Sequence, residues 1–284
     1  SCICEGDINN DGFLDLYIGG SKGYPGSIYL WNKNKFKKYN YQILDEDKES
    51  EDTDCLFFDA NSDGRIDLYV SSGGNEYSIY SPELRDRLYF NFNNDFKKSD
   101  QILPAGLFES SSVVKNIDLD SDGDQDLFVG TRLIPQKYGL PSNGYLLKND
   151  GNGSFSNITD EIADDLKGIG MITDAEFLDY DSDGDLDLII VGHWMPITLF
   201  ENIDGNFSLK RIEDFENTNG WWNSIKVEDL NNDGLLDIVI GNHGQNSRFR
   251  ASQSKPITMY INDFDDNNSL EQVIFQYNGD SSYT

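Results

Sequence analysis

Short apolar runs, rich in β-branched and aromatic residues, recur along the chain on either side of polar, aspartate-rich segments. The run that follows each polar segment is Leu16–Ile18, Leu68–Val70, Leu127–Val129, Leu188–Ile190 or Ile238–Ile240. Runs of this length and composition, closed by Gly or Ser, are typical of strands buried on both faces. Each polar segment with its two flanking runs therefore predicts a β-hairpin.

A second hairpin follows the first in four of the repeats. It consists of an apolar stretch that ends in Asn, a short polar turn and then a Phe. The four copies run from Tyr29–Asn32 to Phe36, from Leu88–Asn91 to Phe96, from Leu146–Asn149 to Phe155 and from Leu199–Asn202 to Phe207. Each repeat thus predicts four short antiparallel strands.

Four-stranded units repeated in this way favour a β-propeller, in which neighbouring blades bury both faces of each sheet and protect its edges. A linear β-solenoid would have much shorter coils. We therefore predict an all-β chain that forms a single β-propeller domain over residues 1–284, with five recognisable four-stranded blades and part of a sixth. Because the chain begins on a first strand and ends soon after a last loop, we expect it to be a piece of a longer protein.

The polar segments are five copies of one nine-residue loop. Position 6 is Gly in every copy, whereas position 7 varies freely. Positions 1, 3, 5 and 9 are always Asp or Asn: Asp7, Asn9, Asp11 and Asp15; Asp59, Asn61, Asp63 and Asp67; Asp118, Asp120, Asp122 and Asp126; Asp179, Asp181, Asp183 and Asp187; Asp229, Asn231, Asp233 and Asp237.

The spacing of these oxygen donors indicates calcium. Side-chain oxygens at positions 1, 3, 5 and 9, with a backbone carbonyl at position 7, can surround a hard cation, and we expect about five Ca²⁺ sites. Zinc would require His or Cys, which the loops lack, and magnesium is rarely given such a cage. An EF-hand is excluded because its twelfth position must be Glu and is here apolar. Ordinary Asp-rich turns have no use for Asp at position 9.

A sixth, degenerate loop follows the run from Ile257 to Ile261. It places Asp263, Asp265, Asn267 and Glu271 at the four ligand positions, but it lacks the Gly and ends in Glu. We expect it to belong to the partial sixth blade, and its binding of calcium stays open.

The charge balance excludes one class of partner. The 22 basic and 51 acidic residues give a formal net charge of −29, whereas nucleic-acid binding needs a concentrated basic surface. Hydrophobic residues make up 37% of the chain, enough for a packed core. No apolar run approaches the roughly 20 residues of a membrane helix, so we expect no membrane insertion in this segment.

At this point the loops resemble a known family. Asp-x-Asp/Asn-x-Asp-Gly-x-x-Asp-Leu/Ile between two strands is similar to the FG-GAP (VCBS-like) repeats of the integrin α-subunit propeller and of many secreted bacterial proteins. The segments Gly192–Pro196 and Asn242–Arg248 are more similar still to the bacterial relatives of cartilage acidic protein. Residue by residue, the resemblance implies calcium ligation only. It does not imply one biochemical activity, since the family includes adhesion receptors and carbohydrate-binding proteins and is an appendage in some enzymes. We expect an extracytoplasmic bacterial protein, secreted or at the cell surface, because weak calcium sites suit extracellular calcium levels.

The loops that leave the second strands lie at the opposite end of each blade from the calcium loops. The two histidines of the chain occupy the same position in adjacent repeats, six residues after the ninth-position Asp, and Arg132 occupies it in a third. Aromatic and Arg residues on loops held by a rigid scaffold favour a recognition surface. The candidate ligand-binding residues are Arg132, His193, Trp194, Trp221, Trp222, His243 and Arg248.

Two functions are compatible with this face. The first is a non-enzymatic module that recognises a protein or a glycan. The alternative is an enzyme acting on a polysaccharide, in which His193, His243 and Arg132 transfer protons and stabilise charge. A third, structural interpretation is that the tryptophans fill the propeller centre, since Trp is usually well buried.

Overall fold

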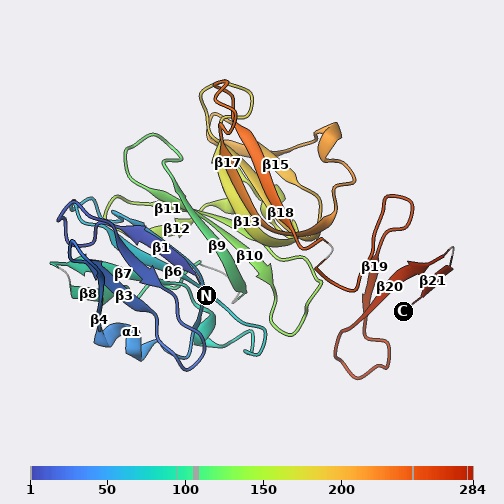
Figure 1. Ribbon diagram of the computed structural model, residues 1–284, viewed down its shortest axis with the longest axis horizontal. Coiled ribbons are helices and arrows are strands. Elements are labelled where there is room, and N and C mark those ends of the chain that lie inside the picture. Colours follow the sequence, from blue (N-terminus) through green and yellow to red (C-terminus); the bar gives the residue numbers. More distant parts are fainter. Residues whose placement is uncertain (1, 94, 105–108, 245, 280, 284) are drawn as a thin grey trace.

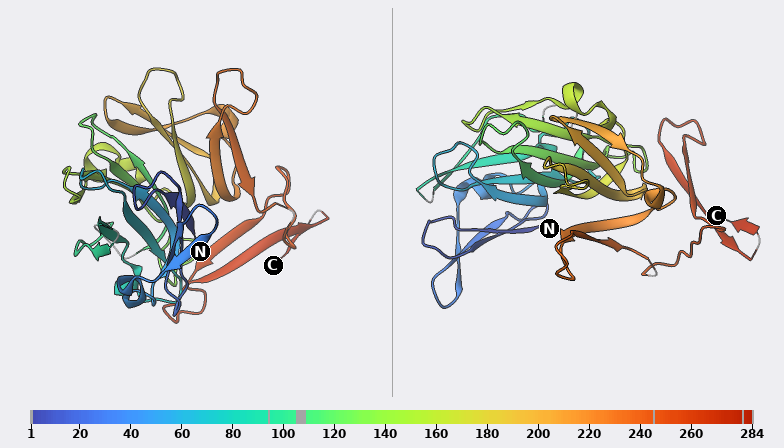
Figure 2. Two further views of the ribbon diagram at one scale, coloured as in Figure 1. Left: turned by 60° about the vertical axis from the view of Figure 1, so that its left-hand side comes forward. Right: turned by 90° about the horizontal axis from the view of Figure 1, so that it is seen from above.

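Strands account for nearly all the regular structure of the chain. The computed structural model describes residues 2–93, 95–104, 109–244, 246–279 and 281–283, and among these residues the strands form five antiparallel sheets (Figure 1). The three sheets that come first in the chain and a larger fourth sheet lie together, and a small C-terminal sheet lies to one side of them (Figure 2). The predicted all-β fold is confirmed.

Each of the first three repeats folds into a sheet in which four strands follow one another in chain order, and we call such a four-stranded unit a blade. Blade one consists of β1 (Ile3–Gly6), β2 (Asp15–Ile18), β3 (Ser27–Trp31) and β4 (Phe36–Tyr39). Blade two consists of β5 (Glu51–Phe58), β6 (Asp67–Gly73), β7 (Arg87–Phe92) and β8 (Asp95–Lys98). Blade three consists of β9 (Ser110–Ile117), β10 (Asp126–Leu133), β11 (Gly144–Asn149) and β12 (Phe155–Asn157).

The fourth repeat forms a larger sheet with part of the fifth. Blade four consists of β13 (Met171–Leu178), β14 (Asp187–Met195), β15 (Thr198–Ile203) and β16 (Asn206–Lys210). The end of β14 also pairs with β17 (Gly220–Glu228), which pairs in turn with β18 (Asp237–Asn242). A separate sheet contains β19 (Thr258–Asn262), β20 (Glu271–Asn278) and β21 (Ser281–Tyr283).

Helical turns are short and lie in the connections. They are α1 (Gln42–Glu46), η1 (Pro82–Leu84), α2 (Thr159–Ile162), η2 (Asp164–Leu166) and η3 (Glu213–Phe215). None of the described helices is long and apolar enough to cross a membrane.

The first strands of successive repeats lie side by side, in the order β1, β5, β9, β13 and β17. The first strands of neighbouring repeats therefore form one continuous line through the molecule. Apolar side chains fill the spaces between neighbouring blades: Leu88 of blade two packs with Leu127 and Leu147 of blade three, and Phe128 of blade three packs with Leu188 and Phe200 of blade four. These residues are 1% exposed or less.

Polar side chains cross from one first strand to the next. Ser112 Oγ donates a hydrogen bond to the Ile172 carbonyl at 2.7 Å, and Thr173 Oγ1 donates to the Trp222 carbonyl at 2.8 Å. In the other direction Asp54 Oδ2 accepts the Val114 N–H at 2.9 Å, and burial raises the pKa of Asp54 to about 6. These side chains thus supply hydrogen bonds between neighbouring first strands that do not pair through their backbones.

The number of blades and the single domain over residues 1–284 stay predictions. The run predicted to start a sixth blade does form a strand, β19, and it pairs with β20 across the sixth loop. In the fifth repeat, no third strand follows β18 in its sheet among the described residues. Ser1 and Thr284, the ends of the predicted domain, and Gln245, in the segment Asn242–Arg248, lie outside the described residues.

Candidate functional site

The five nine-residue loops share one backbone conformation. At position 1, Asp7 accepts the N–H of Asp11 at 3.0 Å through one oxygen and that of Gly12 at 2.8 Å through the other, and the other four loops repeat both bonds. Position 6 has φ between +82° and +99°, a left-handed conformation that glycine adopts at no steric cost. This conformation explains the invariant Gly.

The ninth-position Asp joins the loop to its blade. In loop two, Asp67 is fully buried; its Oδ2 accepts the Ala60 N–H at 3.0 Å and its Oδ1 accepts the Asn91 N–H of the third strand at 2.7 Å. Asp126 and Asp187 make the same pair of bonds in blades three and four. The residue that ends the loop therefore also fixes the third strand.

The Asn at the end of the third strand connects neighbouring loops. Asn149 Nδ2 donates to the carbonyl of Gln125 in its own loop at 3.1 Å and to the carbonyl of Ala60 in the preceding loop at 2.8 Å. Asn91 makes the corresponding bonds to Ile66 and Ile8. Loops one, two and three are therefore joined through two asparagines.

Carboxylates crowd together within the loops. Oxygens of Asp118, Asp120 and Asp122 lie within 4.8 Å of one another, and so do those of Asp179, Asp181 and Asp187. Burial, opposed by two backbone hydrogen bonds, raises the pKa of Asp67 to about 6. The desolvated carboxylates of Asp15 and Asp126 have raised pKa values for the same reason. A cation would relieve both the desolvation and the mutual repulsion of these groups.

These donors fit calcium. Carboxylate and amide oxygens, with no His or Cys in the loops, are the ligands of a hard cation. Lys148 ion-pairs with Asp120 and lies 4.0 Å from an oxygen of Asp122 in loop three, so its ammonium partly offsets the charge of this acidic loop. Asp120, Asp122 and their counterparts in the other loops would hold the ion, which would supply compensating charge and rigidity.

The sixth loop has the same conformation despite its altered sequence. Asp263 accepts the N–H groups of Asn267 and Asn268 at 2.9 and 2.7 Å, and Glu271 Oε2 accepts the Phe264 N–H at 2.8 Å. Asn268 takes the place of the Gly with φ +67°, a region that Asn tolerates better than most residues. Carboxylate oxygens of Asp263, Asp265 and Glu271 lie within 4.8 Å of one another.

Four of the predicted ligand-binding residues converge around one ring. Trp221 lies 5.4 Å from Trp194, 6.0 Å from His193 and 5.3 Å from His243, measured between ring centroids. Phe249 contacts the same indole at 5.7 Å, and the Arg248 guanidinium lies 5.1 Å from the Phe249 ring. We call His193, Trp194, Trp221, His243 and Phe249 the aromatic face. It is built at the junction of β14 and β17, where His193 pairs with Trp221.

A polar hollow lies beside the aromatic face. It has a volume of about 340 Å³. Its lining comes from the first strands β5, β9, β13 and β17, from the second strand β10 and from the loop after β2. The lining residues are Gly20, Ser21, Glu51, Asp52, Thr53, Ser111, Ser112, Arg132, Thr173 and Asn223. Asn223 Oδ1 lies 3.3 Å from His193 Nε2 and so joins the hollow to the face.

The pKa of His193 depends on its burial and on three neighbouring side chains, those of Asn223, Arg132 and His243. Burial lowers the pKa of His193, the Asn223 contact raises it, and the charges of Arg132 and His243 lower it further. The lowered pKa favours the neutral form of the His193 imidazole. Its Nδ1 atom and the Trp221 Nε1 atom are buried without a hydrogen-bond partner among the described residues.

The structure separates the adjacent tryptophans. Trp222 packs against the apolar cluster of β14 and β18, and its Nε1 donates to the Thr218 carbonyl at 2.9 Å. Trp222 therefore points away from the aromatic face, as alternation along a strand requires. Tyr138, from a loop expected on the same face, accepts the Trp194 Nε1–H through its hydroxyl at 3.2 Å. Two contributors, Asn223 and Phe249, were missed from the sequence. Their only sequence signal is that they belong to strands or loops that carry predicted residues.

Acidic loops of fixed spacing in a repeating all-β fold define a class of acidic-loop repeat proteins. A family model described as FG-GAP-like repeat matches residues 7–70, 118–190 and 179–240. These ranges cover more than half of the chain, and the chain belongs to the FG-GAP-like repeat family. The predicted family is confirmed.

Comparison with other proteins adds little detail. The chain is similar to a solved structure described as the V. cholerae biofilm matrix protein Bap1, with 14% sequence identity and a TM-score of 0.46; the match covers 84% of this chain and 34% of that one. The present chain thus spans about a third of the length of that protein. The search of curated proteins gave no match.

Proposed function

We propose that this chain is a non-enzymatic, calcium-binding β-propeller that acts outside the cytoplasm, secreted or at the cell surface, and recognises a protein or a glycan through the aromatic face. The observation that carries the proposal is the convergence of three predicted residues, His193, Trp194 and His243, on a fourth, Trp221, across two neighbouring repeats. Aromatic side chains held on a rigid scaffold give large contact area at little entropic cost.

The calcium loops support the proposed location outside the cytoplasm. The ligand set of each loop is compatible with the weak sites of extracellular modules, which work at about 10⁻⁴ to 10⁻³ M calcium. Because the loops join first to second strands and the aromatic face follows the second strands, the two features lie at opposite ends of the blades. Calcium would therefore stabilise the scaffold without touching the ligand.

The histidines support recognition over catalysis. A general base needs a partner that orients it and a pKa near the working pH. His193 faces an amide, and among the described residues no carboxylate hydrogen-bonds to either imidazole. The polysaccharide-active alternative thus has two histidines and an arginine in one region, but among the described residues neither imidazole is hydrogen-bonded to a carboxylate that would orient it as a base.

The test combines a binding screen with matched tryptophan variants. Calcium-loaded protein would be applied to a glycan array and used in pulldowns, and the strongest ligand would be titrated against three variants. We expect Trp221→Ala to weaken binding at least tenfold, Phe13→Ala, an exposed aromatic at the calcium end, to have no effect, and Trp222→Ala to lower the melting temperature while binding persists. Equal binding by the wild type and Trp221→Ala would overturn the proposed face.

A further inference from the structure

The outer edge of β18 has no partner. β18 pairs with β17 on one side, and no other described strand pairs with it. In blades two to four the second strand is central and buried on both faces, whereas Val239 of β18 is 51% exposed and its counterpart Ile189 of β14 is fully buried. Open edges with unpaired backbone groups accept further strands.

Asp237 shows which strand is missing. Its Oδ2 accepts the Leu230 N–H at 3.0 Å, as the ninth-position Asp does in the other loops. In Asp67, Asp126 and Asp187 the second oxygen accepts an N–H from the third strand of the same blade. Asp237 receives the first of these bonds from its loop, while β18 lacks the strand that would donate the second.

The sequence of β19 matches that of a third strand. The segment Pro196-Ile-Thr-Leu-Phe-Glu-Asn202, which contains most of β15, shares four of seven residues with Pro256-Ile-Thr-Met-Tyr-Ile-Asn262, which contains β19. Tyr260 takes the place of Phe200, which lies opposite Leu188 on β14. Asn262 takes the place of Asn202, whose N–H donates to Asp187.

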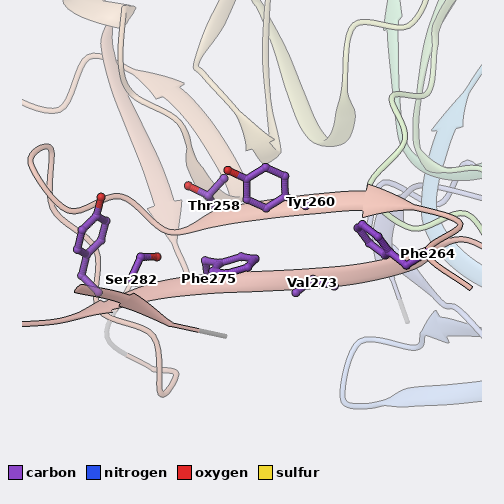
Figure 3. Close-up of a pocket in the computed structure, with 7 residues that line it drawn as sticks. Thr258, Tyr260, Phe264, Val273, Phe275 and Ser282 are labelled. Carbon is purple, nitrogen blue, oxygen red and sulfur yellow. The ribbon is translucent and has the colours of Figure 1, made fainter. Parts of the chain in front are cut away.

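The hairpin of β19 and β20 leaves apolar surface open. Tyr260 packs edge-on against Phe275 at 5.3 Å but is 56% exposed, and Phe264 is 53% exposed. These side chains line an open hollow of about 530 Å³ together with Thr258 and Val273 (Figure 3). Phe200 at the corresponding position in blade four is fully buried.

We infer that β19 is the third strand of blade five and adds to the open edge of β18 in the same chain, giving a four-stranded blade in the order β17, β18, β19, β20. By the register of blade four, Ile238 would lie opposite Tyr260, Val239 opposite Met259 and Ile240 opposite Thr258. The Asn262 N–H would reach Asp237 Oδ1. β20 becomes the fourth strand, and this arrangement replaces the partial sixth blade.

The connection favours the same chain as the source of the strand. Residues 243–257 join β18 to β19, and the corresponding connections in blades two and three, residues 74–86 and 134–143, are of similar length and return within one chain. In the structure, Met259 and Ile261 lie against Gly139 of the blade-three connection. When β19 adds to β18 and closes the blade, this contact is exchanged for pairing with β18.

Closure would also anchor part of the aromatic face. Residues 243–257 carry His243, Arg248 and Phe249, and Phe249 contacts Trp221. With β19 in place, both ends of this connection are held in one sheet, as both ends of residues 134–143 are held in blade three. The ordered loop would then present its rings as a fixed surface.

A pair of engineered cysteines tests the register in the full chain. Val239→Cys with Met259→Cys places two thiols opposite each other, whereas the control Val239→Cys with Tyr260→Cys places them on opposite faces, because a one-residue slip reverses the side chains. We expect the first pair to form an intrachain disulfide at least tenfold faster than the control pair. Peptide mapping distinguishes this disulfide from any disulfide of Cys2, Cys4 and Cys55. Equal rates, or cross-links only between chains, would overturn the inference.

Hydrogen exchange on the unmodified protein gives an independent measurement. In a closed blade both edges of β18 are paired, so all its amides should be protected to within about tenfold of those of β14. In an open blade, alternate amides of β18 should exchange at rates near those of unstructured chain. The second pattern would show that β19 does not add to β18.

Discussion

At the scale of single residues, position in the nine-residue loop decides what a carboxylate does. Asp122 Oδ1 accepts the Asp124 N–H at 3.1 Å, while Asp124 Oδ1 is buried without a hydrogen-bond partner among the described residues. Burial, with the adjacent Asp122, raises the pKa of Asp124 to about 6. The side chain at position 5 thus supports the loop, and the one at position 7 adds repulsion.

This difference predicts unequal effects of two neighbouring substitutions. Asp122→Ala should weaken calcium binding at loop three by at least about tenfold, or about 1.4 kcal/mol, because a ligand and a loop hydrogen bond are lost together. Asp124→Ala should change it by less than about threefold, since position 7 contributes its carbonyl. Calorimetric titration with calcium measures both, and Asp183→Ala with Asp185→Ala repeats the comparison in loop four. Equal losses within a pair would contradict the assigned roles.

A buried ion pair supports the centre of the molecule. Arg87 Nη2 lies 2.5 Å from Asp52 Oδ1, and both side chains are less than 5% exposed. The hydroxyl of Tyr17 also donates to Asp52, at 2.7 Å. Asp52 lines the polar hollow, so the pair fixes one wall of it.

We expect Arg87→Met to lower the free energy of unfolding by about 3–5 kcal/mol, because it leaves the Asp52 charge buried without its partner. Lys167→Met provides the matched control: Lys167 pairs with Asp160 and Asp164 at the surface, where an ion pair contributes about 0–1 kcal/mol. Urea unfolding of both variants in calcium would compare them. A loss below about 1 kcal/mol for Arg87→Met would contradict a structural role for this buried pair.

At the scale of the elements, the third strand connects each loop to the one before it. Asn149 bonds to both loop two and loop three. Among the described residues, Asn32 at the end of β3 bonds only locally, with Lys35. The same residue type in the same position therefore has different consequences in different blades.

Asn149→Ala should cost about 1–3 kcal/mol of stability, because two carbonyls lose their donor in a buried place. It should also weaken calcium binding at loop two, where no residue has been changed. Asn32→Ala should cost less than about 0.5 kcal/mol. Melting curves and calcium titrations of both variants test this; an effect of Asn149→Ala confined to loop three would argue against coupling between loops.

The same elements show what sequence could and could not predict. Loops such as Asp118–Asp126 were predictable because their ligand spacing and Gly are local features that recur, and the four-stranded sheets followed from the apolar runs around them. The Asn149 side chain was recognised only as the end of a strand, since its bond to Ala60 spans 89 residues. The convergence on Trp221 followed in part from the equivalent positions of His193 and His243, but Phe249 comes from a connection with no periodic pattern. The similarity of Pro256–Asn262 to a third strand is present in the sequence. The acidic loop directly after it instead favoured its interpretation as the first strand of another repeat.

At the scale of the whole molecule, the net charge of −29 is concentrated where the loops lie. The five loops contain 19 of the 51 acidic residues. Carboxylates about 4 Å apart repel by roughly 1 kcal/mol per pair even at the dielectric constant of water. Without a cation, this repulsion acts in every blade at the same end and opposes the apolar packing between the blades.

Removing calcium should therefore lower the melting temperature of the whole chain. A site with Kd near 10⁻⁴ M at about 10⁻³ M calcium adds about 1.4 kcal/mol by mass action, so five sites add about 7 kcal/mol. For a chain of this size we expect excess chelator to lower the melting temperature by roughly 10–20 °C. Differential scanning calorimetry with and without chelator measures the shift.

Two controls separate ion binding from charge screening. Magnesium at the same concentration should restore less stability than calcium, because it keeps its waters and rarely occupies such a cage. Sodium chloride at about 1 M should recover only part of the loss, since it screens the carboxylates at a Debye length of about 3 Å without coordinating them. If the melting curve in excess chelator matches that in calcium, the loops are ordinary Asp-rich hairpins. If salt alone restores full stability, their carboxylates are repelling charges and not ligands. A shift that calcium reverses and salt does not would assign the loops to the metal.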